Sequence, residues 1–420
     1  MEAKLPTRVI DVGPPDGSQE PYLRQISASD QGPYIALSHC WGKERLLTTT
    51  KDTFDDRCKQ IPLSSLPKTF QDAVLVVRKF NVRYLWIDSL CIIQDSTEDW
   101  SAESKTMCRI YQDCLFTIAA GHAEGSRFGC FVQRDGDLHR PLELPIRPHF
   151  LKQEPYRCWF EPIVPTVSVN TPDLPLHTRA WVLQEQVLSP RTLLFDTDEI
   201  HWQCMAMHGS ERSPQGGIAR HLPFMHELRS YVGGITSEDD DVKKRFLWSH
   251  TFRTAVHEYS CRSLTQWSDK LIAIYGVADA LRNVFGGEYI CGLWKEDFLK
   301  GLLWYVPVQP SEIDRLRNHP AYKSYPACRV EGYTNPSWSW ASAESAIVYY
   351  EIPNGHLASL NIISRIVNLD DLHDGTVGQD STAVKIEGDT RVGYVKCTYR
   401  VSDFLTLLLT FNINMATVGH

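Results

Sequence analysis

Two acidic side chains stand at positions where a carboxylate could take part in catalysis. Asp88 ends the apolar run 84–87, which is typical of a buried strand, and Glu103 lies in the segment that follows. A carboxylate placed there can stabilise a positive charge that develops on a bound ligand, or hold the hydroxyl groups of that ligand. We therefore predict Asp88 and Glu103 as the catalytic residues. Two structural alternatives stay open: Asp88 as the cap of the next turn, and Glu103 as an ion-pair partner of Arg179 or a helix-face charge.

Polar and aromatic side chains elsewhere are candidates for binding a ligand. Arg179 could hold a phosphate with its planar guanidinium group, or instead form a buried pair with Glu103 or Asp88. An aromatic ring such as Trp41 or Trp181 could stack on a base. A thiol nucleophile is disfavoured, because neighbours in an extended chain point apart and His39 cannot easily activate Cys40. The candidate ligand-binding residues are Ser38, His39, Cys40, Trp41, Cys91, Gln94, Tyr111, Arg179, Trp181, Gln184 and Glu185.

The elements that must position these residues show clear periodicity. The apolar run 34–38 predicts a buried strand, and Phe70, Ala73, Val74, Val77 and Phe80 recur at helical spacing. Strands at 84–88 and 116–120, with a helix near 97–114 between them, repeat the strand-helix-strand order of a parallel sheet. Ligands bind beyond the carboxyl ends of such strands. The loop after 34–38 and the residues after 84–87 should therefore form opposite walls of one crevice.

The rest of the chain predicts a further region. Residues 1–33 are rich in Pro, Gly, Asp and Ser and predict an N-terminal arm or hairpin. The stretches 192–195 and 199–204 suggest a hairpin, and a polar linker near 210 suggests a boundary. Beyond it, helices are expected at about 240–260, 267–284 and 296–305, and β-structure at 337–340 and 346–352. The predicted fold is an α/β domain with a mostly parallel sheet and flanking helices, followed by a helical and β-rich C-terminal region.

Composition excludes several classes of partner. The net charge of −8 argues against binding to nucleic acid or to an anionic membrane surface. No apolar stretch has the length of a membrane span and no secretory signal is visible, so a cytoplasmic protein is expected. The twelve cysteines contain no CxxC pair, and no metal site is predicted. No GxSxG, P-loop or GxGxxG motif favours an α/β-hydrolase, an NTPase or a nicotinamide oxidoreductase.

Several ordered segments resemble the fungal heterokaryon incompatibility (HET) domain. They are 34–42 (YIALSHCWG), 66–73 (LPKTFQDA) and 84–95 (YLWIDSLCIIQD), followed by 100–111 and by 179–185 (RAWVLQE) before 189–191. Two later segments, 267–271 (WSDKL) and 336–342 (PSWSWAS), resemble sequences often found after this domain. By this resemblance the chain comprises a HET domain at 34–209 and a C-terminal α+β region, 210–420, packed on it.

The resemblance also implies a function. HET domains are considered distant relatives of TIR domains, which have a flavodoxin-like sheet and in several lineages cleave nicotinamide from NAD. This implies a protein of heterokaryon incompatibility and programmed cell death, with hydrolysis of NAD or a related nucleotide as a candidate activity and with no resident cofactor. Two alternatives stay open: a non-enzymatic module that self-associates or binds a protein partner, and a HET-like enzyme recruited to small-molecule (secondary metabolite) biosynthesis.

Overall fold

The computed structural model describes residues 4–27, 29–44, 46–134, 142–146, 156–160, 174–211, 213–216, 223–232, 241–307, 328–329, 335–336, 338–349, 365–367 and 385–387. The chain divides into two compact units. Unit 1 comprises Met1–Asp239, Ile272–Ala280 and His319–Ala321, and unit 2 comprises Asp240–Leu271, Leu281–Asn318 and Tyr322–His420.

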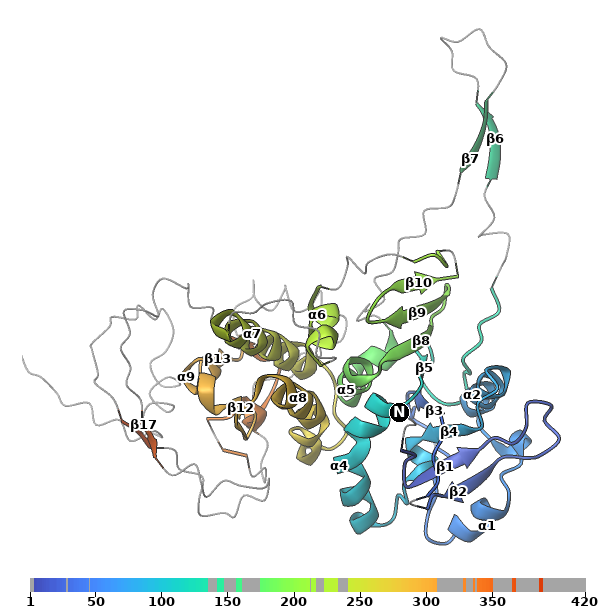
Figure 1. The fold of residues 1–420 in the computed structure, drawn as a ribbon, viewed down its shortest axis with the longest axis horizontal. Coiled ribbons are helices and arrows are strands. Elements are labelled where there is room, and N and C mark those ends of the chain that lie inside the picture. The colour runs from blue at the N-terminus through green and yellow to red at the C-terminus, as the bar shows by residue number, and fades with distance from the viewer. Residues whose placement is uncertain are drawn as a thin grey trace, which may run out of the picture. The chain divides into compact units, whose positions relative to one another are not determined.

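Unit 1 is built on an eight-stranded mixed sheet with the order β10-β9-β8-β5-β3-β4-β1-β2 (Figure 1). Its strands are β1 Arg8–Asp11, β2 Tyr22–Gln25, β3 Tyr34–Ser38, β4 Tyr84–Ile87, β5 Thr117–Ala120, β8 Arg191–Phe195, β9 Ile200–Cys204 and β10 His208–Ser210. The central strands β8, β5, β3 and β4 pair in parallel. The outer strands pair antiparallel, β9 and β10 at one edge and β1 and β2 at the other.

The prediction of a mostly parallel sheet is therefore wrong, because antiparallel pairings outnumber parallel ones. Its source was the strand-helix-strand rhythm of 34–120, which covers only the centre of the sheet. Hairpins extend both edges, and a short connection can join only antiparallel neighbours. The predicted hairpin at 192–204 is confirmed by the pairing of β8 with β9, from Arg191 opposite Cys204 to Phe195 opposite Ile200.

Helices connect the parallel strands. They are α2 Lys68–Lys79 between β3 and β4, α3 Asp88–Cys91 and α4 Thr97–Asp113 between β4 and β5, and α5 Trp181–Leu188 before β8. In chain order the four parallel strands lie 2-1-3-4, so successive connections diverge between β3 and β5. In open α/β sheets this divergence marks the crevice where ligands bind.

The helix predicted from residue 66 is confirmed in α2. Phe70, Ala73, Val74 and Val77 are fully buried, as the helical spacing requires. Phe80 was assigned to the same stripe but is half exposed, because it lies one residue past the end of the helix. The other helix of the sheet, α4, begins where the Ser96 hydroxyl accepts a hydrogen bond from the Asp99 amide, a regular N-cap.

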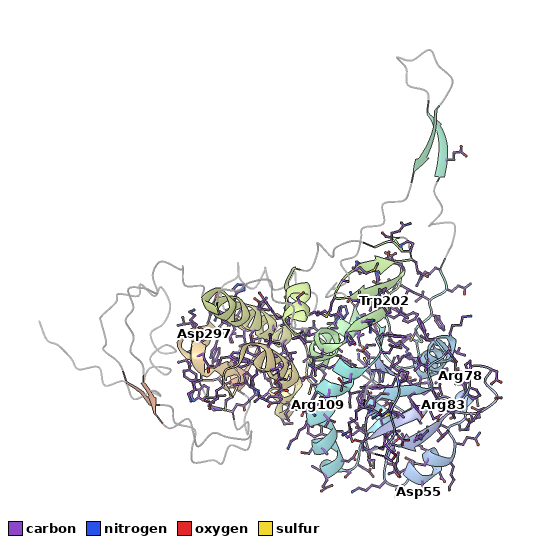
Figure 2. The ribbon with its side chains drawn as sticks, viewed as in Figure 1. Asp55, Arg78, Arg83, Arg109, Trp202 and Asp297 are labelled. Atoms are coloured by element: carbon purple, nitrogen blue, oxygen red, sulfur yellow. The ribbon has the colours of Figure 1, made fainter. Side chains whose placement is uncertain are left out.

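The N-terminal hairpin is part of the sheet, since β1 pairs with both β2 and β4. Two arginines labelled in Figure 2 fix it to the α2–β4 turn. Arg78 donates from Nε and Nη2 to the Val12 carbonyl, at 2.8 and 2.6 Å. Arg83 donates from Nε to the fully buried Asp11 carboxylate at 2.9 Å. Residues 8–25 are thus held by long-range polar contacts as well as by the strand pairing.

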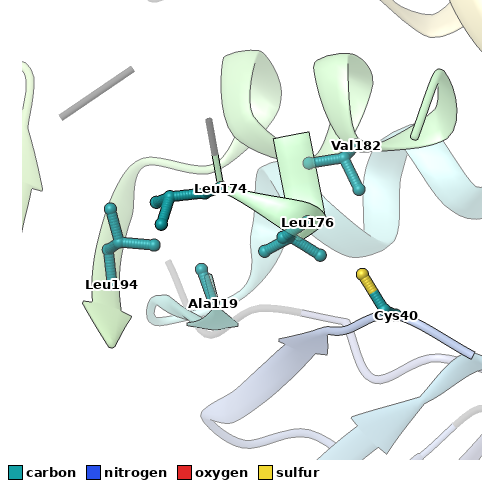
Figure 3. Close-up of a cluster of buried hydrophobic side chains, with 6 residues drawn as sticks. All are labelled: Cys40, Ala119, Leu174, Leu176, Val182 and Leu194. Carbon is teal, nitrogen blue, oxygen red and sulfur yellow. The ribbon is translucent and has the colours of Figure 1, made fainter. Parts of the chain in front are cut away.

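Smaller elements complete unit 1. They are α1 Phe54–Lys59, η1 Leu63–Ser65, the β6–β7 hairpin Leu142–Ile146 and Tyr156–Phe160, η3 Pro175–Thr178 and α6 Pro223–Val232. The short helix η3 supplies part of an apolar cluster that lies over the carboxyl end of β5 (Figure 3). Its members are Cys40, Ala119, Leu174, Leu176, Val182 and Leu194. The cluster packs Cys40, two residues past the end of β3, against the segment that leads into α5.

Unit 2 contains helices and short antiparallel strand pairs. Its elements are α7 Asp241–Ser260, η4 Trp267–Asp269, the C-terminal part of α8 Ile272–Phe285, η5 Lys295–Asp297, α9 Phe298–Gly301 and η6 Trp340–Ser342, with strands β11 Tyr289–Ile290, β12 Leu293–Trp294, β13 Trp304–Tyr305, β14 Cys328–Arg329, β15 Ala343–Glu344, β16 Val348–Tyr349, β17 Arg365–Val367 and β18 Lys385–Glu387. The α7 and α8 helices confirm two predictions. Within the described residues, no helix combines the length and the apolar character needed to cross a bilayer.

The prediction of β-structure over 337–340 is wrong for the residues that the structure describes. Ser339 turns the chain instead, because its hydroxyl accepts a hydrogen bond from the Ala341 amide and caps η6. The same hydroxyl donates to the Cys291 carbonyl at 2.6 Å. The apolar run that follows forms a strand only at Val348–Tyr349 among the described residues. The apolar segment 404–411 lies outside the described part of the chain.

Candidate functional site

Asp88 lies at the carboxyl end of β4 and joins the loop after β3. Its Oδ2 accepts a hydrogen bond from Trp41 Nε1 at 2.8 Å, and its Oδ1 accepts one from the Ser89 amide at 2.7 Å. His39 Nδ1 lies 3.8 Å from Oδ1. Asp88 is also the first residue of α3, so it orders the local turn as well as facing the neighbouring loop. The structure thus brings together the two strand ends from which the crevice was predicted.

His39 is buried on the α2 side of the sheet. Its ring meets Phe70 edge to face with centroids 4.9 Å apart. Burial lowers the pKa of His39 to about 4, against the opposing effect of Asp88, and Arg179 lowers it further. The imidazole is therefore neutral near pH 7, and its buried Nε2 has no hydrogen-bond partner within the described residues.

Glu185 forms a second acidic position, on α5. Its carboxyl group is only 3% exposed, and Arg179, Ser38, Asp88 and Tyr111 lie close enough to shift its pKa. Burial raises that pKa most strongly and Asp88 raises it further, whereas Arg179 and the hydroxyls of Ser38 and Tyr111 oppose the rise. Ser38 Oγ nevertheless makes no hydrogen bond of ordinary geometry, and neither does Glu185 Oε2.

Arg179 and Tyr111 connect this position to β3. Arg179 Nη1 donates to the His39 carbonyl, and Tyr111 donates from its hydroxyl to the Leu37 carbonyl at 3.3 Å. Of the open alternatives for Arg179, the structure gives no hydrogen-bonded pair with Glu103 or Asp88 in the described part. Its charge acts on His39, Cys40 and Glu185. The geometry thus leaves Arg179 half-buried beside the acidic cluster.

Glu103 lies in a different polar cluster. Arg8 at the start of β1 donates from Nη2 to Asp99 Oδ2 at 2.6 Å and to Glu103 Oε1 at 3.3 Å. Arg8 Nε also donates to the Cys91 carbonyl at 2.6 Å. Burial raises the pKa of Glu103, and Arg8 opposes that rise. Glu103 therefore has an ion-pair partner, but the partner is Arg8 and not the Arg179 considered from the sequence.

The two candidate thiols are buried and protonated at neutral pH. Burial raises the pKa of Cys40 to about 11 and that of Cys91 to about 12. Cys40 packs in the apolar cluster of Figure 3 beside Leu176 and Val182. Since the thiolate is the nucleophilic form of cysteine, neither position suits nucleophilic catalysis.

The remaining candidate binding residues have mainly local roles. Gln94 donates from Nε2 to the Asp88 carbonyl at 3.1 Å and so ties the turn after α3 to the site. Gln184 is buried, and its Oε1 accepts a hydrogen bond from the Gly276 amide at 2.9 Å. Trp181 is partly exposed at the first residue of α5. The structure therefore brings Gln94 to the site and turns the Gln184 amide oxygen to Gly276.

Two glycines allow the loops after β3 and β5 to touch. Gly42 has a positive φ of 79°, and a Cβ on it would lie 3.0 Å from Gly125 Cα. A Cβ on Gly125 would lie 3.1 Å from Gly42 Cα. The backbones meet where the connections diverge, and the ion pair of Arg127 with Glu44 joins the same loops. Nothing in the sequence indicated the contact of Gly42 with Gly125.

Sequence reasoning also missed two polar residues. Ser89 is fully buried beside Asp88, and its hydroxyl has no hydrogen-bond partner among the described residues. Arg8 neutralises Glu103 from the first strand. A buried serine after a strand and one arginine far along the chain carry no local pattern that singles them out.

Comparisons with known proteins match one segment of the chain, and the residues around Asp88 and Glu185 lie within that segment. Within the described residues, no group of three or more His, Cys, Asp or Glu could hold a metal ion. No curated protein and no solved structure matches the chain significantly. One family model does match, over 34–185, a segment that begins at β3 and ends at Glu185 and leaves Arg8 outside. The model is described as heterokaryon incompatibility protein (HET), and this segment of the chain is therefore a HET domain.

Proposed function

We propose that the chain acts in heterokaryon incompatibility and programmed cell death by hydrolysing NAD or a related nucleotide in the cytoplasm. The observation that carries the proposal is the convergence of six side chains at the carboxyl ends of β3 and β4. They come from separate parts of the HET domain and are Ser38, Trp41, Asp88, Tyr111, Arg179 and Glu185. Such a set supplies carboxylates, hydroxyls, one cation and an aromatic ring, which are the groups that a nucleotide requires.

Each group has a place in N-glycosidic cleavage. A carboxylate stabilises the cation that develops on the ribose, and nicotinamide leaves as a neutral molecule, so no strong general acid is needed. Arg179 carries a planar guanidinium suited to a phosphate. Trp41 is half-buried, with its indole nitrogen fixed on Asp88, and its ring is available as a platform for a base.

The test measures free nicotinamide after NAD is incubated with the purified protein. Wild-type protein is expected to release nicotinamide, and Asp88→Ala to reduce the rate by at least about 100-fold. Asp88→Ala removes the acceptor of the Trp41 hydrogen bond, so circular dichroism of both proteins controls for misfolding. Release at the buffer rate by well-folded wild-type protein would sink the proposal.

A second candidate function is self-association, and exposed apolar side chains favour it. Leu75 and Phe80 are about half exposed at α2, and Phe128 and Phe131 are about half exposed in the loop after β5. Light scattering over a range of protein concentrations tests this reading. Leu75→Ser with Phe80→Ser should lower the apparent mass of any assembly, and a concentration-independent monomer would exclude it.

A further inference from the structure

The two buried glutamates of the HET domain, Glu103 and Glu185, differ in how many of their carboxyl oxygens have hydrogen-bond partners. Glu103 is 5% exposed and Glu185 is 3% exposed, so neither carboxyl group is solvated by bulk water. Glu103 accepts a hydrogen bond from Arg8, and Asp99 lies beside it on the same cation. Glu185 Oε2 makes no hydrogen bond of ordinary geometry within the described residues, although the hydroxyls of Ser38 and Tyr111 lie near enough to lower its pKa. A buried polar group without a partner is costly and calls for a ligand or a water as its explanation.

We propose, resting on the function above, that Glu185 and not Glu103 is the carboxylate that faces the ribose of the bound nucleotide, with Ser38 beside it. Ser38 Oγ is the second orphaned atom of this cluster, and the side chain is 2% exposed. One carboxylate oxygen and one hydroxyl together accept and donate as the two neighbouring hydroxyls of a ribose require. The site is thus inferred to select a ribose over a deoxyribose.

The surroundings of Glu185 fit this role. Arg179 and Tyr111 both lie close enough to lower its pKa, so the carboxylate has a cation and a hydroxyl as neighbours. Asp88 adds a second negative charge nearby, which strengthens the attraction for a developing cation. Burial also raises the pKa of Glu185, and a carboxylate with a raised pKa is the better proton acceptor.

The reaction balances with water as the only co-reactant. The bond between ribose C1′ and the pyridinium nitrogen breaks, and its electron pair leaves with the nitrogen, so nicotinamide departs neutral. The cation left on the ribose is stabilised by ionised Glu185. Water adds its oxygen to C1′ and gives one proton to Glu185, which later releases it to solvent. The products are nicotinamide, ADP-ribose and one proton.

The experiment compares Glu185→Gln with the matched variant Glu103→Gln. Each exchange removes one buried carboxylate and keeps the size of the side chain. We expect Glu185→Gln to lower nicotinamide release by about 100-fold or more. Glu103→Gln should keep the rate within about threefold when assayed well below its melting temperature, because Asp99 still holds Arg8. The reverse order of losses, in folded proteins, would overturn the proposal.

Binding of ADP-ribose separates this inference from the proposed activity. Isothermal titration should show at least about tenfold weaker binding to Glu185→Gln than to wild type, with Glu103→Gln unchanged. It should also show weaker binding to wild type of 2″-deoxy-ADP-ribose, which lacks the 2-hydroxyl of the ribose that carried nicotinamide. Binding without nicotinamide release would refute the hydrolysis but keep the ribose site. Equal binding by both variants, or no binding by wild type, would refute the ribose site itself.

Discussion

Two acidic clusters flank β4, and they use their charges in opposite ways. In the Arg8 cluster, one guanidinium group contacts Asp99, Glu103 and the Cys91 carbonyl. In the Glu185 cluster, the cation Arg179 donates its hydrogen bond to a backbone carbonyl, and acidic and hydroxyl oxygens keep open hydrogen-bonding capacity. Saturated charges stabilise a fold, whereas unsaturated buried groups cost stability and are kept where a ligand satisfies them.

The largest effect expected from this contrast is on stability, at Arg8. Arg8→Met leaves Glu103 and the Cys91 carbonyl without their donor in a buried place. We expect the free energy of unfolding to fall by about 3 kcal/mol, the usual cost of breaking a buried pair from one side. Chemical denaturation followed by circular dichroism measures it.

An exposed ion pair supplies the control for that experiment. Arg127 pairs with Glu44, and both side chains are more than half exposed. Arg127→Met removes the same kind of charge but should change the free energy of unfolding by no more than about 0.5 kcal/mol. If Arg8→Met and Arg127→Met lowered the free energy of unfolding equally, the Arg8 cluster would not be a major source of the stability of the fold.

A smaller effect is expected at His39, which lies beside the Glu185 cluster. The pKa of His39 in the folded protein is about 4, below the ordinary value of 6.5. Between these two pH values the unfolded chain binds a proton at His39 that the folded chain does not bind. The stability that neutral His39 provides is complete above about pH 6.5 and is lost as pH falls toward 4. His39→Asn should flatten this acid loss by roughly 2 kcal/mol between pH 6 and 4.5.

Thermal unfolding at several pH values, compared between wild type and His39→Asn, measures the effect as a difference in slope. The carboxylates titrate in both proteins and cancel in that difference. Parallel pH profiles would show that the pKa of His39 is the same in the folded and unfolded states, and would imply a stronger interaction with Asp88 than the 3.8 Å separation indicates.

Local periodicity explains why much of the central fold was predictable. Phe70, Ala73, Val74 and Val77 repeat at helical spacing because one face of α2 is buried, and the apolar run before Asp88 is a strand buried at the sheet centre. Because the carboxyl ends of parallel strands meet at one edge of a sheet, Asp88 was expected near the loop that contains Trp41. A hairpin was predicted at 192–204, but its place as an antiparallel edge of the sheet was not, because pairing with the sheet leaves no mark in the sequence of the partner strand.

Partners far apart in the chain could not be assigned. Arg8 and Glu103 are separated by 95 positions, and Arg179 and His39 by 140. The sequence left open an ion pair of Glu103, but only the fold decides which basic residue is its partner, because β1 lies beside β4 and α3. The same holds for Glu185, because nothing in the sequence of α5 indicates that Arg179, Ser38 and Tyr111 lie near its carboxyl group.

The smallest effect expected has the opposite sign and concerns Glu185 itself. Burial raises its pKa, so the folded state holds this proton more tightly than the unfolded state. Its contribution to stability is complete below the ordinary carboxyl pKa and is lost as pH rises through the raised value. Glu185→Gln removes the titration, and at pH 8 it should raise the free energy of unfolding by about 1 kcal/mol, with little difference near pH 4.

Unfolding midpoints of wild type and Glu185→Gln at pH 4 and pH 8 measure this prediction. Glu103→Gln is the informative comparison. Burial raises its pKa as well, but Arg8 loses one of its two acidic partners, so the gain at pH 8 should be smaller than for Glu185→Gln or absent. A clear gain at Glu185 without one at Glu103 would separate a group kept for a ligand from a group kept for the fold. Destabilisation by both exchanges at pH 8 would mean that Glu185 is saturated in the folded protein.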